Sequence, residues 1–155
     1  MTQKVVKFIS EHAEELIERG RKDFGVLADA DVSMRPYFDV VAAQDGNAYS
    51  IIKDGHLVLS AGVWELWSGV GEAWLLPSAQ LLARPRGPVR IVRQYLDDIA
   101  LKEGFERVQA TTHADFKRGH RWLTWLGFEL EGVLRKFGPD GSDHNIYSRI
   151  KKCHK

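Results

Sequence analysis

The sequence contains one cysteine, Cys153, so no disulfide can form within the chain. A chain of this kind suits a reducing compartment. Long apolar runs are also missing, and no stretch approaches the roughly 20 residues that a membrane-spanning helix needs. The N-terminal residues lead from a short apolar patch into a charged segment, which does not match a signal peptide. We therefore expect a soluble cytoplasmic protein with no membrane as partner.

Neither sign of charge dominates. Lysine and arginine number 22 against 21 aspartates and glutamates, which gives a formal net charge of +1. This balance argues against a general polyanion-binding surface, and we do not expect nucleic acid as a partner. Metal-ligand spacing is absent as well, because His120, His144 and His154 are scattered and Cys153 has no second thiol. The sequence therefore predicts no metal site.

Apolar residues, in contrast, are plentiful. They make up 44% of the 155 residues, which is enough for one packed core, and we expect a single domain over residues 1–155. The β-branched runs, the Asp54-Gly55 hairpin signal and the helical periodicities define the elements. Strands are predicted over residues 5–9, 48–53, 56–67, 72–76, 105–112, 128–137 and 145–150. Helices are predicted over residues 11–21, 36–45, 88–103 and 114–126, with a loop over residues 78–87.

The order of these elements predicts a mixed α/β fold. Strands that follow one another directly favour antiparallel pairs, and the strand–helix–strand unit in the middle of the chain favours one parallel pair through a right-handed crossover. Gly62 is expected to mark a bulge or bend in its strand. The last strand and its hairpin are expected at an exposed sheet edge, where a second copy of the chain could pair to form a homodimer.

The segment from Arg107 to Tyr147 carries the most specific pattern. It reads strand, helix, Leu126-Gly127-Phe128, strand, tight turn, strand. This pattern and the order of elements resemble the Gcn5-related N-acetyltransferase (GNAT) superfamily, most strongly from about residue 48 onward. The resemblance implies the GNAT-like acyl-CoA N-acyltransferase fold, with a central mixed sheet of six to seven strands and helices on both faces. It also implies acetyl-CoA as co-substrate and an amine, on a small molecule or a protein, as acceptor.

In this family the fourth and fifth strands diverge, and the pantetheine arm of acyl-CoA enters between them. The pyrophosphate then lies on backbone amides of a loop at the start of the next helix, because a helix N-terminus is an anion site. In this sequence the resemblance puts Leu75 and Leu76 on the fourth strand, beside the pantetheine. It puts the loop at residues 84–89, where Arg84 and Gly87 match the first two fixed positions of the family motif.

The loop also departs from the motif. Pro88 has no N–H to give to a phosphate, and Val89 puts a branched side chain where family members have glycine or alanine. Arg84 and Arg86 could offset this loss through guanidinium–phosphate pairs, and the ordinary alternative is that they are two solvated loop arginines. The resemblance assigns cofactor contacts to Leu75, Leu76, Arg84, Arg86, Gly87 and Val89.

Candidate catalytic residues are few. Family enzymes often carry a tyrosine four residues before the glycine of the Leu-Gly-Phe pattern, as a general acid, and here that position is Leu123. The candidate general bases are Glu72, at the start of the fourth strand, Glu65, on the preceding strand and facing either the same cleft or its opposite, and His113, at the end of the fifth. Histidine as a residue type titrates near neutral pH, which favours His113. The ordinary alternatives are a Glu72 solvated beside a turn and a His113 that serves as a cap at a strand end.

Two functions remain from the sequence. The first is an acetyl-CoA-dependent N-acetyltransferase, which the element order, the match of Arg84 and Gly87 and the position of His113 favour. The second is a non-catalytic protein of the same fold that acts through protein contacts in virion assembly, with virion proteins as partners.

The second function rests on a narrower resemblance. Short-tailed bacteriophages encode a small GNAT-like internal virion or virion-assembly protein whose phosphate loop is similarly eroded. The departures at Pro88, Val89 and Leu123, together with a tryptophan-rich region between residues 62 and 76, resemble that branch. These tryptophans are expected either to fill the core or to line an acceptor pocket or a partner surface.

Overall fold

The computed structural model describes residues 3–23, 39, 47–138 and 140–152, and a seven-stranded mixed sheet with the order β1-β2-β3-β4-β5-β7-β6 forms its centre. The strands are β1 (Gln3–Lys7), β2 (Ala48–Lys53), β3 (His56–Trp67), β4 (Val70–Pro77), β5 (Arg107–His113), β6 (Glu129–Leu134) and β7 (His144–Ile150). The helices are α1 (Ser10–Asp23), α3 (Ala79–Ala83), α4 (Arg86–Glu103) and α5 (Lys117–Trp125).

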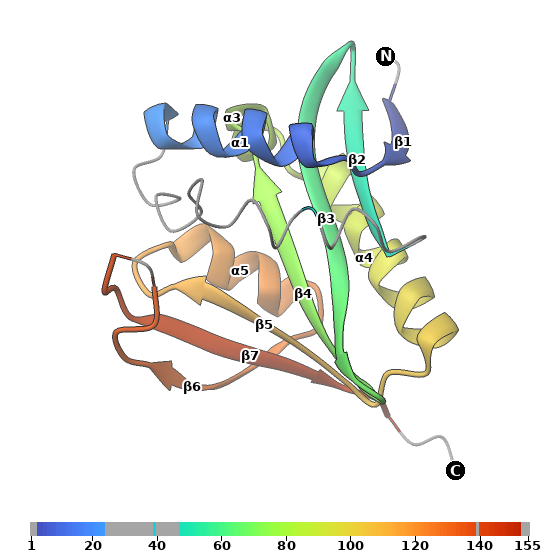
Figure 1. The fold of residues 1–155 in the computed structure, drawn as a ribbon, viewed down its shortest axis with the longest axis vertical. Helices are drawn as coiled ribbons and strands as arrows, with labels where there is room; N and C mark the ends of the chain where they lie inside the picture. The colour runs from blue at the N-terminus through green and yellow to red at the C-terminus, as the bar shows by residue number, and fades with distance from the viewer. Residues whose placement is uncertain (1–2, 24–38, 40–46, 139, 153–155) are drawn as a thin grey trace.

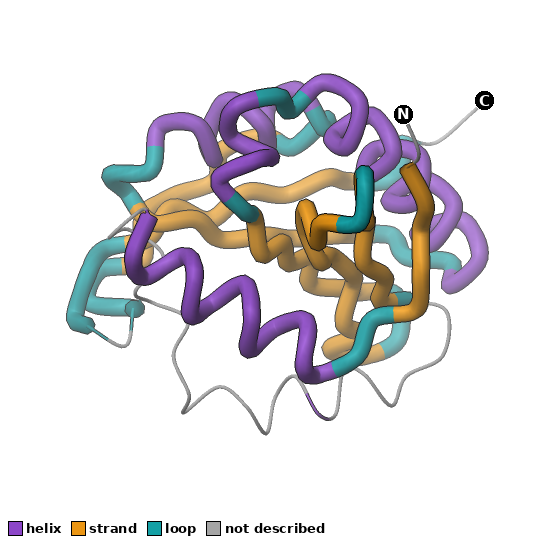
Figure 2. The backbone as a smooth tube through the Cα atoms, turned by 90° about the horizontal axis from the view of Figure 1, so that it is seen from above, coloured by secondary structure: helices purple, strands orange, loops and turns teal. Residues whose placement is uncertain are grey.

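Helices cover both faces of this sheet (Figure 1). Seen from above, α1 runs along one face, and α3, α4 and α5 run along the other (Figure 2). β4 and β5 form the predicted parallel pair, and the remaining neighbours in the sheet pair antiparallel. The arrangement confirms the predicted fold class, a mixed sheet with helices on both faces. No helix within the described residues is long and apolar enough to cross a membrane.

A core cluster fills each side of the sheet. On one side, apolar residues of α4 that recur every three or four positions, such as Val89, Val92 and Leu96, pack on the strands. On the other side, Leu16 of α1 packs with Phe8 and with residues of β2, β3 and β4. Burial of each such large apolar side chain contributes about 1.5–3 kcal/mol. The two clusters therefore fix the helices to opposite faces of the sheet.

Part of the loop predicted over residues 78–87 is helical. The Ser78 hydroxyl oxygen accepts a hydrogen bond from the Leu81 N–H at 3.2 Å, and this cap starts the five-residue helix α3. Helix α4 then begins at Arg86, before Pro88, because a proline in the first turn removes no intrahelical hydrogen bond. The connection between α3 and α4 is therefore short.

Gly62 does not mark a bulge, which was one of the two alternatives expected at this position. It pairs in regular register with Ala48 on β2 and with Trp74 on β4. The reason for a glycine is a close backbone approach, because a Cβ at this position would lie 2.5 Å from the carbonyl oxygen of Asn47. The register of β3 shifts elsewhere, near each of its ends.

The last strand is internal, which corrects the expectation of an exposed edge. The β6–β7 hairpin folds back so that β7 lies between β5 and β6. The two outer strands of the sheet, among the strands that the structure describes, are therefore β1 and β6, and each could extend it by pairing with a second copy. The helix predicted over residues 36–45 lies outside the described residues, apart from residue 39.

A buried polar chain connects α1 to the sheet. The Ser50 hydroxyl lies 2.8 Å from Nδ1 of His12 on α1 and 2.7 Å from the Ser60 hydroxyl, and both serines are fully buried. Burial lowers the pKa of His12, although Glu15 and Glu11 act in the opposite direction. The folded protein therefore favours the neutral imidazole.

This burial predicts a pH-dependent stability. The folded pKa of His12 lies below the unfolded value of about 6.5, so the unfolded state binds the extra proton first as the pH falls. The contribution of His12 is fully present above this unfolded value and is lost as the pH falls toward the folded pKa. When the pH is lowered from about 7 to about 5, we expect the free energy of unfolding to fall less in His12→Asn than in the unchanged protein.

The measurement is urea unfolding at both pH values, with His56→Asn as the control, because His56 is exposed at the start of β3. Equal pH slopes for His12→Asn and the unchanged protein would contradict the prediction.

Candidate functional site

The candidate site lies where β4 and β5 diverge. Their parallel pairing covers three residue pairs, from Val70 with Arg107 to Glu72 with Gln109. Beyond Glu72, β4 continues its pairing with β3, and the two parallel strands run apart (Figure 1). Among the described strands, none pairs with residues 73–77 on the side of β5. We call the last paired position, Glu72 with Gln109, the vertex of the gap.

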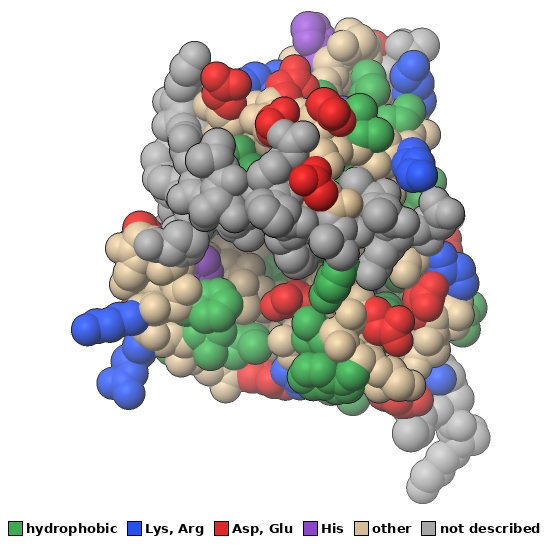
Figure 3. All heavy atoms as spheres, viewed as in Figure 1, with side chains coloured by type: hydrophobic (Ala, Val, Ile, Leu, Met, Phe, Trp, Pro, Cys, Tyr) green, Lys and Arg blue, Asp and Glu red, His purple; other side chains and the backbone are tan. Residues whose placement is uncertain are grey.

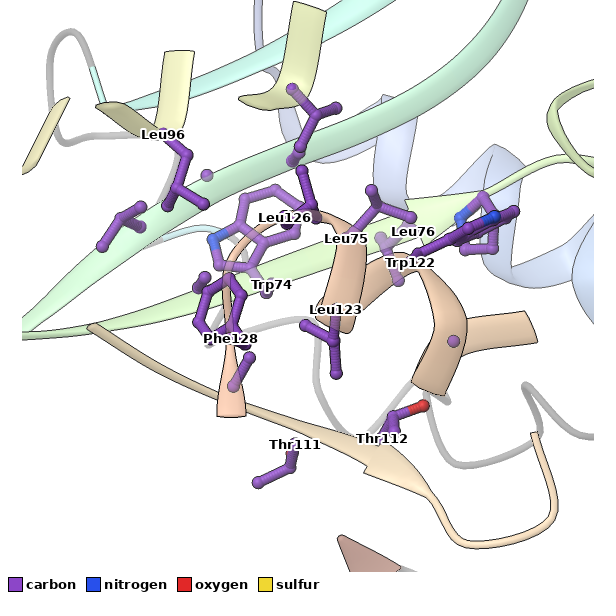
Figure 4. A pocket seen from close by; sticks show the side chains of 18 of the residues that line it. Trp74, Leu75, Leu76, Leu96, Thr111, Thr112, Trp122, Leu123, Leu126 and Phe128 are labelled. Atoms are coloured by element: carbon purple, nitrogen blue, oxygen red, sulfur yellow. The ribbon is translucent and has the colours of Figure 1, made fainter. Parts of the chain in front are cut away.

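A cavity of about 220 Å³ occupies the gap. β4 and β5 line it together with residues of neighbouring strands, and α4 and α5 cover it from one side, so that side chains from strands and helices converge (Figure 4). Its lining is mainly apolar and includes Leu75, Leu76, Leu96, Ile99, Trp122, Leu123, Leu126 and Phe128. A slot of this kind accepts a narrow and mainly apolar chain, and few polar groups are present to orient it.

Residues of β4 that face opposite sides of the sheet line the cavity together. Ala73 and Leu75 pack with the core cluster on the α4 side, and Trp74 and Leu76 pack with the cluster on the α1 side. All four residues line the cavity. Leu75 and Leu76, both predicted as cofactor contacts, lie in its wall.

The predicted anion loop is the start of α4. The first intrahelical bond runs from the Val89 N–H to the Pro85 carbonyl at 2.9 Å. The amides of Arg86 and Gly87, which precede it in the helix, therefore have no intrahelical acceptor, and Pro88 contributes no amide. Two amides and the helix dipole remain for an anion at this terminus.

The side chains around this terminus point in different directions. Val89 is 6% exposed and packs in the core with Val92, so its branched side chain does not cover the helix terminus as the motif comparison suggested. Arg84 and Arg86 are exposed, and within the described residues neither forms an ion pair. Gly87 is also exposed, and a Cβ there would meet nothing closer than a Gln3 side-chain oxygen at 3.7 Å.

Glu72 stands at the vertex of the gap on the α1 face of the sheet. It pairs across the strands with Trp64 of β3, and it is half-buried. Burial raises the pKa of its carboxyl group, and a hydrogen bond from Gln109 partly opposes this effect. A carboxylate with a raised pKa is a better proton acceptor than a fully solvated one.

His113 lies at the open end of β5 and lines the cavity. Its Nδ1 accepts a hydrogen bond from the Asp115 N–H at 3.1 Å, and its ring centroid lies 5.5 Å from that of His144. This turn also explains why α5 begins at Lys117 and not at Ala114 as predicted. Because Nδ1 accepts from a backbone N–H, the neutral ring carries its proton on Nε2.

The two predicted catalytic residues are not neighbours. Gln109 is paired with Glu72, and His113 lies four residues further along β5 on the same face. This spacing corresponds to about 13 Å along the strand. Glu72 and His113 therefore cannot act on one proton, and each must serve a different part of the gap.

Sequence reasoning missed the contribution of α5 and of the chain that follows it. Trp122 and Leu123 of α5, Leu126 at its C-terminal cap and Phe128 line the cavity. Their spacing of three to four residues was the available signal. A tyrosine could act as the general acid, and among the described residues that line the cavity the one tyrosine is Tyr49. Burial raises the pKa of Tyr49, so it is a poor proton donor.

The second tryptophan of α5, Trp125, is 45% exposed, and the guanidinium of Arg93 lies 4.8 Å from its ring centroid. This contact joins α4 to α5 at a distance from the strands. No group of three or more metal-ligating side chains occurs among the described residues.

Comparison with solved structures identifies the fold. Ard1 from Thermoplasma volcanium superposes with a TM-score of 0.77 at 12% identity, over 99% of this chain and 100% of that one. An N-acetyltransferase from Staphylococcus aureus Mu50 superposes with a TM-score of 0.75 at 14% identity, over 98% of this chain and 100% of that one. RimL, a ribosomal L7/L12 alpha-N-protein acetyltransferase in complex with coenzyme A, gives 0.71 at 14% identity, over 97% and 94%.

At identities this low, the superpositions establish a shared fold. The mixed sheet of this chain is that of the GNAT acetyltransferases. At the level of sequence, no protein-family model and no curated protein matches the chain.

Proposed function

We propose that this protein is an N-acyltransferase of the GNAT type, which takes an acetyl group from acetyl-CoA and transfers it to an amine. The observation that carries the proposal is the apolar cavity in the gap between β4 and β5. Support comes from RimL, which has the same fold and was solved in complex with coenzyme A.

The residues of the gap fit the donor, with one exception. Leu75 and Leu76 would contact the pantetheine arm, and the backbone edge of residues 73–77 would pair with its amides. Arg84, the side chain and amide of Arg86 and the amide of Gly87 would bind the phosphates. Val89 would support this terminus from the core. The exception is Pro88, which removes one amide and predicts weaker binding than a complete loop would give.

Glu72 is the residue we assign as general base. When bound, acetyl-CoA supplies the activated thioester carbonyl, and the acceptor must present an uncharged amine to it. The raised pKa of Glu72 suits the removal of a proton from an ammonium group. Trp64 and Trp74 lie on the same face, beside Glu72, and their rings would favour a cationic acceptor.

His113 suits a different role. With Nδ1 occupied by the Asp115 N–H, its neutral ring offers a proton on Nε2 and not a lone pair. We therefore assign His113 as a hydrogen-bond donor at the open end of the cavity. This assignment differs from the expectation of a base, which rested on the residue type and on the position of His113 at the end of the fifth strand.

The non-catalytic alternative keeps specific support. Pro88 weakens the anion site, and Leu123 lines the cavity at the position where family enzymes often carry the tyrosine acid. A protein that acts through contacts in virion assembly would need neither feature. The two functions make opposite predictions for the binding of acetyl-CoA.

Calorimetric titration of acetyl-CoA into the purified protein tests the proposal, with Gly87 as the position to change. We expect binding in the micromolar range. Gly87→Glu should weaken it by at least about tenfold, which is about 1.4 kcal/mol, because the new carboxylate would lie beside the phosphates.

Gly87→Gln is the matched control, since it adds a side chain of similar size without the charge. Both variants should fold, because the position is exposed and has open space around it. Absence of binding at millimolar acetyl-CoA would overturn the proposal and favour the non-catalytic function. Equal weakening by both variants would mean that the size of the added side chain, and not its charge, weakens binding, and no weakening by either would place the phosphates away from the start of α4.

A further inference from the structure

A β-bulge in β6 directs Glu131 across the sheet. The register between β6 and β7 shifts between Leu130 and Gly132, so Glu131 is an additional residue in its strand. Bulges of this kind re-aim a side chain. Here the Glu131 carboxylate reaches Arg107 on β5, with two hydrogen bonds of 2.8 and 2.7 Å, and it also accepts one from the Ser148 hydroxyl.

This ion pair is strong for a surface pair because its geometry is bidentate. The hydrogen bonds from Arg107 and Ser148 lower the pKa of Glu131 to about 2. The hydrogen bond to Glu131 also raises the pKa of Arg107. Both partners therefore stay charged at every pH at which an enzyme of this kind would work, and Arg107 is held in one orientation.

Arg107 in turn orients the side chain of Gln109, two residues along β5. Its Nε–H donates to the side-chain oxygen of Gln109 at 3.1 Å. Arginine Nε can only donate, so the atom of Gln109 that faces it must be the carbonyl oxygen. The NH₂ group is then the part of the amide that is free to donate to Glu72, the cross-strand neighbour of Gln109. Donation there lowers the pKa of this carboxyl group. The amide of Gln109 has one orientation that satisfies both neighbours.

We propose that Gln109 is a positioning residue for Glu72, and that the Arg107–Glu131 pair holds Gln109 in the orientation that donates to this carboxylate. The inference rests on the proposed function for the role of Glu72 as base, but the network itself is independent of it. Its effect is to keep the carboxylate at the vertex in one place and to limit the rise in pKa that burial causes.

Among the residues that the structure describes, the other charged groups around Glu72 leave Gln109 as its specific partner. On β3 the facing residue is Trp64, and Glu65 lies on the opposite face of the sheet. On α1, which packs on this face, His12 and Arg19 are each hydrogen-bonded to sheet residues. The glutamates of α1 are exposed, and acidic side chains gather over this helix in Figure 3.

Carbon-detected NMR titration of the Glu72 carboxyl group tests the network without any substrate, with Glu72→Gln to assign the resonance. We expect Gln109→Met, which keeps the length of the side chain but has no N–H, to raise the pKa of Glu72, because the carboxylate loses a donor. Glu131→Gln should change the pKa of Glu72 as well, and this change should disappear when Gln109→Met is already present.

Glu129→Gln is the charge-matched control, since it removes the same charge from the same strand at an exposed position. It should leave the pKa of Glu72 where it was. An unchanged pKa in Gln109→Met would overturn the proposal. The proposal would also be overturned if Glu131→Gln changed the pKa of Glu72 equally in the presence and absence of Gln109→Met. Such a result would mean that the charge acts directly through space and not through the Gln109 amide.

The reaction gives a second readout. With acetyl-CoA and an accepted amine, the acidic limb of the pH profile of kcat/KM should move to higher pH in Gln109→Met, in step with the NMR value. If the NMR shift occurs but neither the unchanged protein nor the variants transfer acetyl groups, the network stands and the proposed function fails. If the protein is active and the limb does not move, Gln109 does not position the base.

Discussion

Replacing Ala73 with phenylalanine is expected to abolish the binding of acetyl-CoA while the protein stays folded. Ala73 is partly buried on β4 and lines the cavity of about 220 Å³ in the gap. A phenyl ring would occupy space that the ligand needs and would fill a void rather than displace packed atoms. We expect the Kd to rise at least about 100-fold, or about 2.8 kcal/mol. The free energy of unfolding should change by less than about 1.5 kcal/mol.

Calorimetry and urea unfolding measure the two effects separately, and Ala83→Phe is the control. Ala83 lies at the exposed end of α3, so the same substitution there adds the ring outside the cavity. If Ala73→Phe binds acetyl-CoA as the unchanged protein does, the ligand does not enter the gap. If the variant loses much of its stability, the cavity cannot take the ring, and the loss of binding says nothing about the ligand.

The largest expected loss of stability is at Gly62. A Cβ there would lie 2.5 Å from the Asn47 carbonyl oxygen and 3.0 Å from the Ala48 Cα. Both obstacles are backbone, and the same carbonyl accepts a hydrogen bond from the Val63 N–H at 2.9 Å, so β2 and β3 must separate to admit a methyl group. We expect Gly62→Ala to reduce the free energy of unfolding by about 3 kcal/mol, at the upper end of the range for overpacking.

Gly132→Ala on β6 is the matched control. It is also a glycine in a strand, but nothing lies within 4 Å of its Cβ position. A Gly→Ala change at such a site is expected to be neutral or to stabilise by up to about 1 kcal/mol, because it restricts the unfolded chain. Urea unfolding of both variants decides the matter. A small effect at Gly62 would mean that the two strands can separate at little cost.

Local signals were sufficient for much of this fold. The Asp54-Gly55 pair closes the β2–β3 hairpin with both residues at positive φ, and Gly104 ends α4 in the left-handed conformation. The strand–helix–strand order required a parallel pair, and β4 and β5 form it. Leu75 and Leu76 came from the family resemblance and not from a local signal, and both line the cavity.

Other features depend on contacts that have no local signal. Glu131 and Arg107 are 24 residues apart, and the bulge that joins them comes from the register between β6 and β7. The proton position on His113 depends on one backbone N–H, which residue type alone does not reveal. At Val89 two signals disagreed: the family motif suggested contact with a phosphate, whereas the helical period shared with Val92 indicated the core. The helical period was correct because α4 already begins at Arg86.

The short vertex also has a mechanical consequence. β1 to β4 form one wing of the sheet and β5, β7 and β6 form the other, and only three residue pairs join them, whereas β5 and β7 share seven. Bending between the wings therefore breaks the fewest backbone hydrogen bonds at this position. An extended ligand that pairs with the backbone edge of residues 73–77 would act as an added strand where the two wings join. Amide hydrogen exchange should then slow along that edge, and the two wings should move as one body.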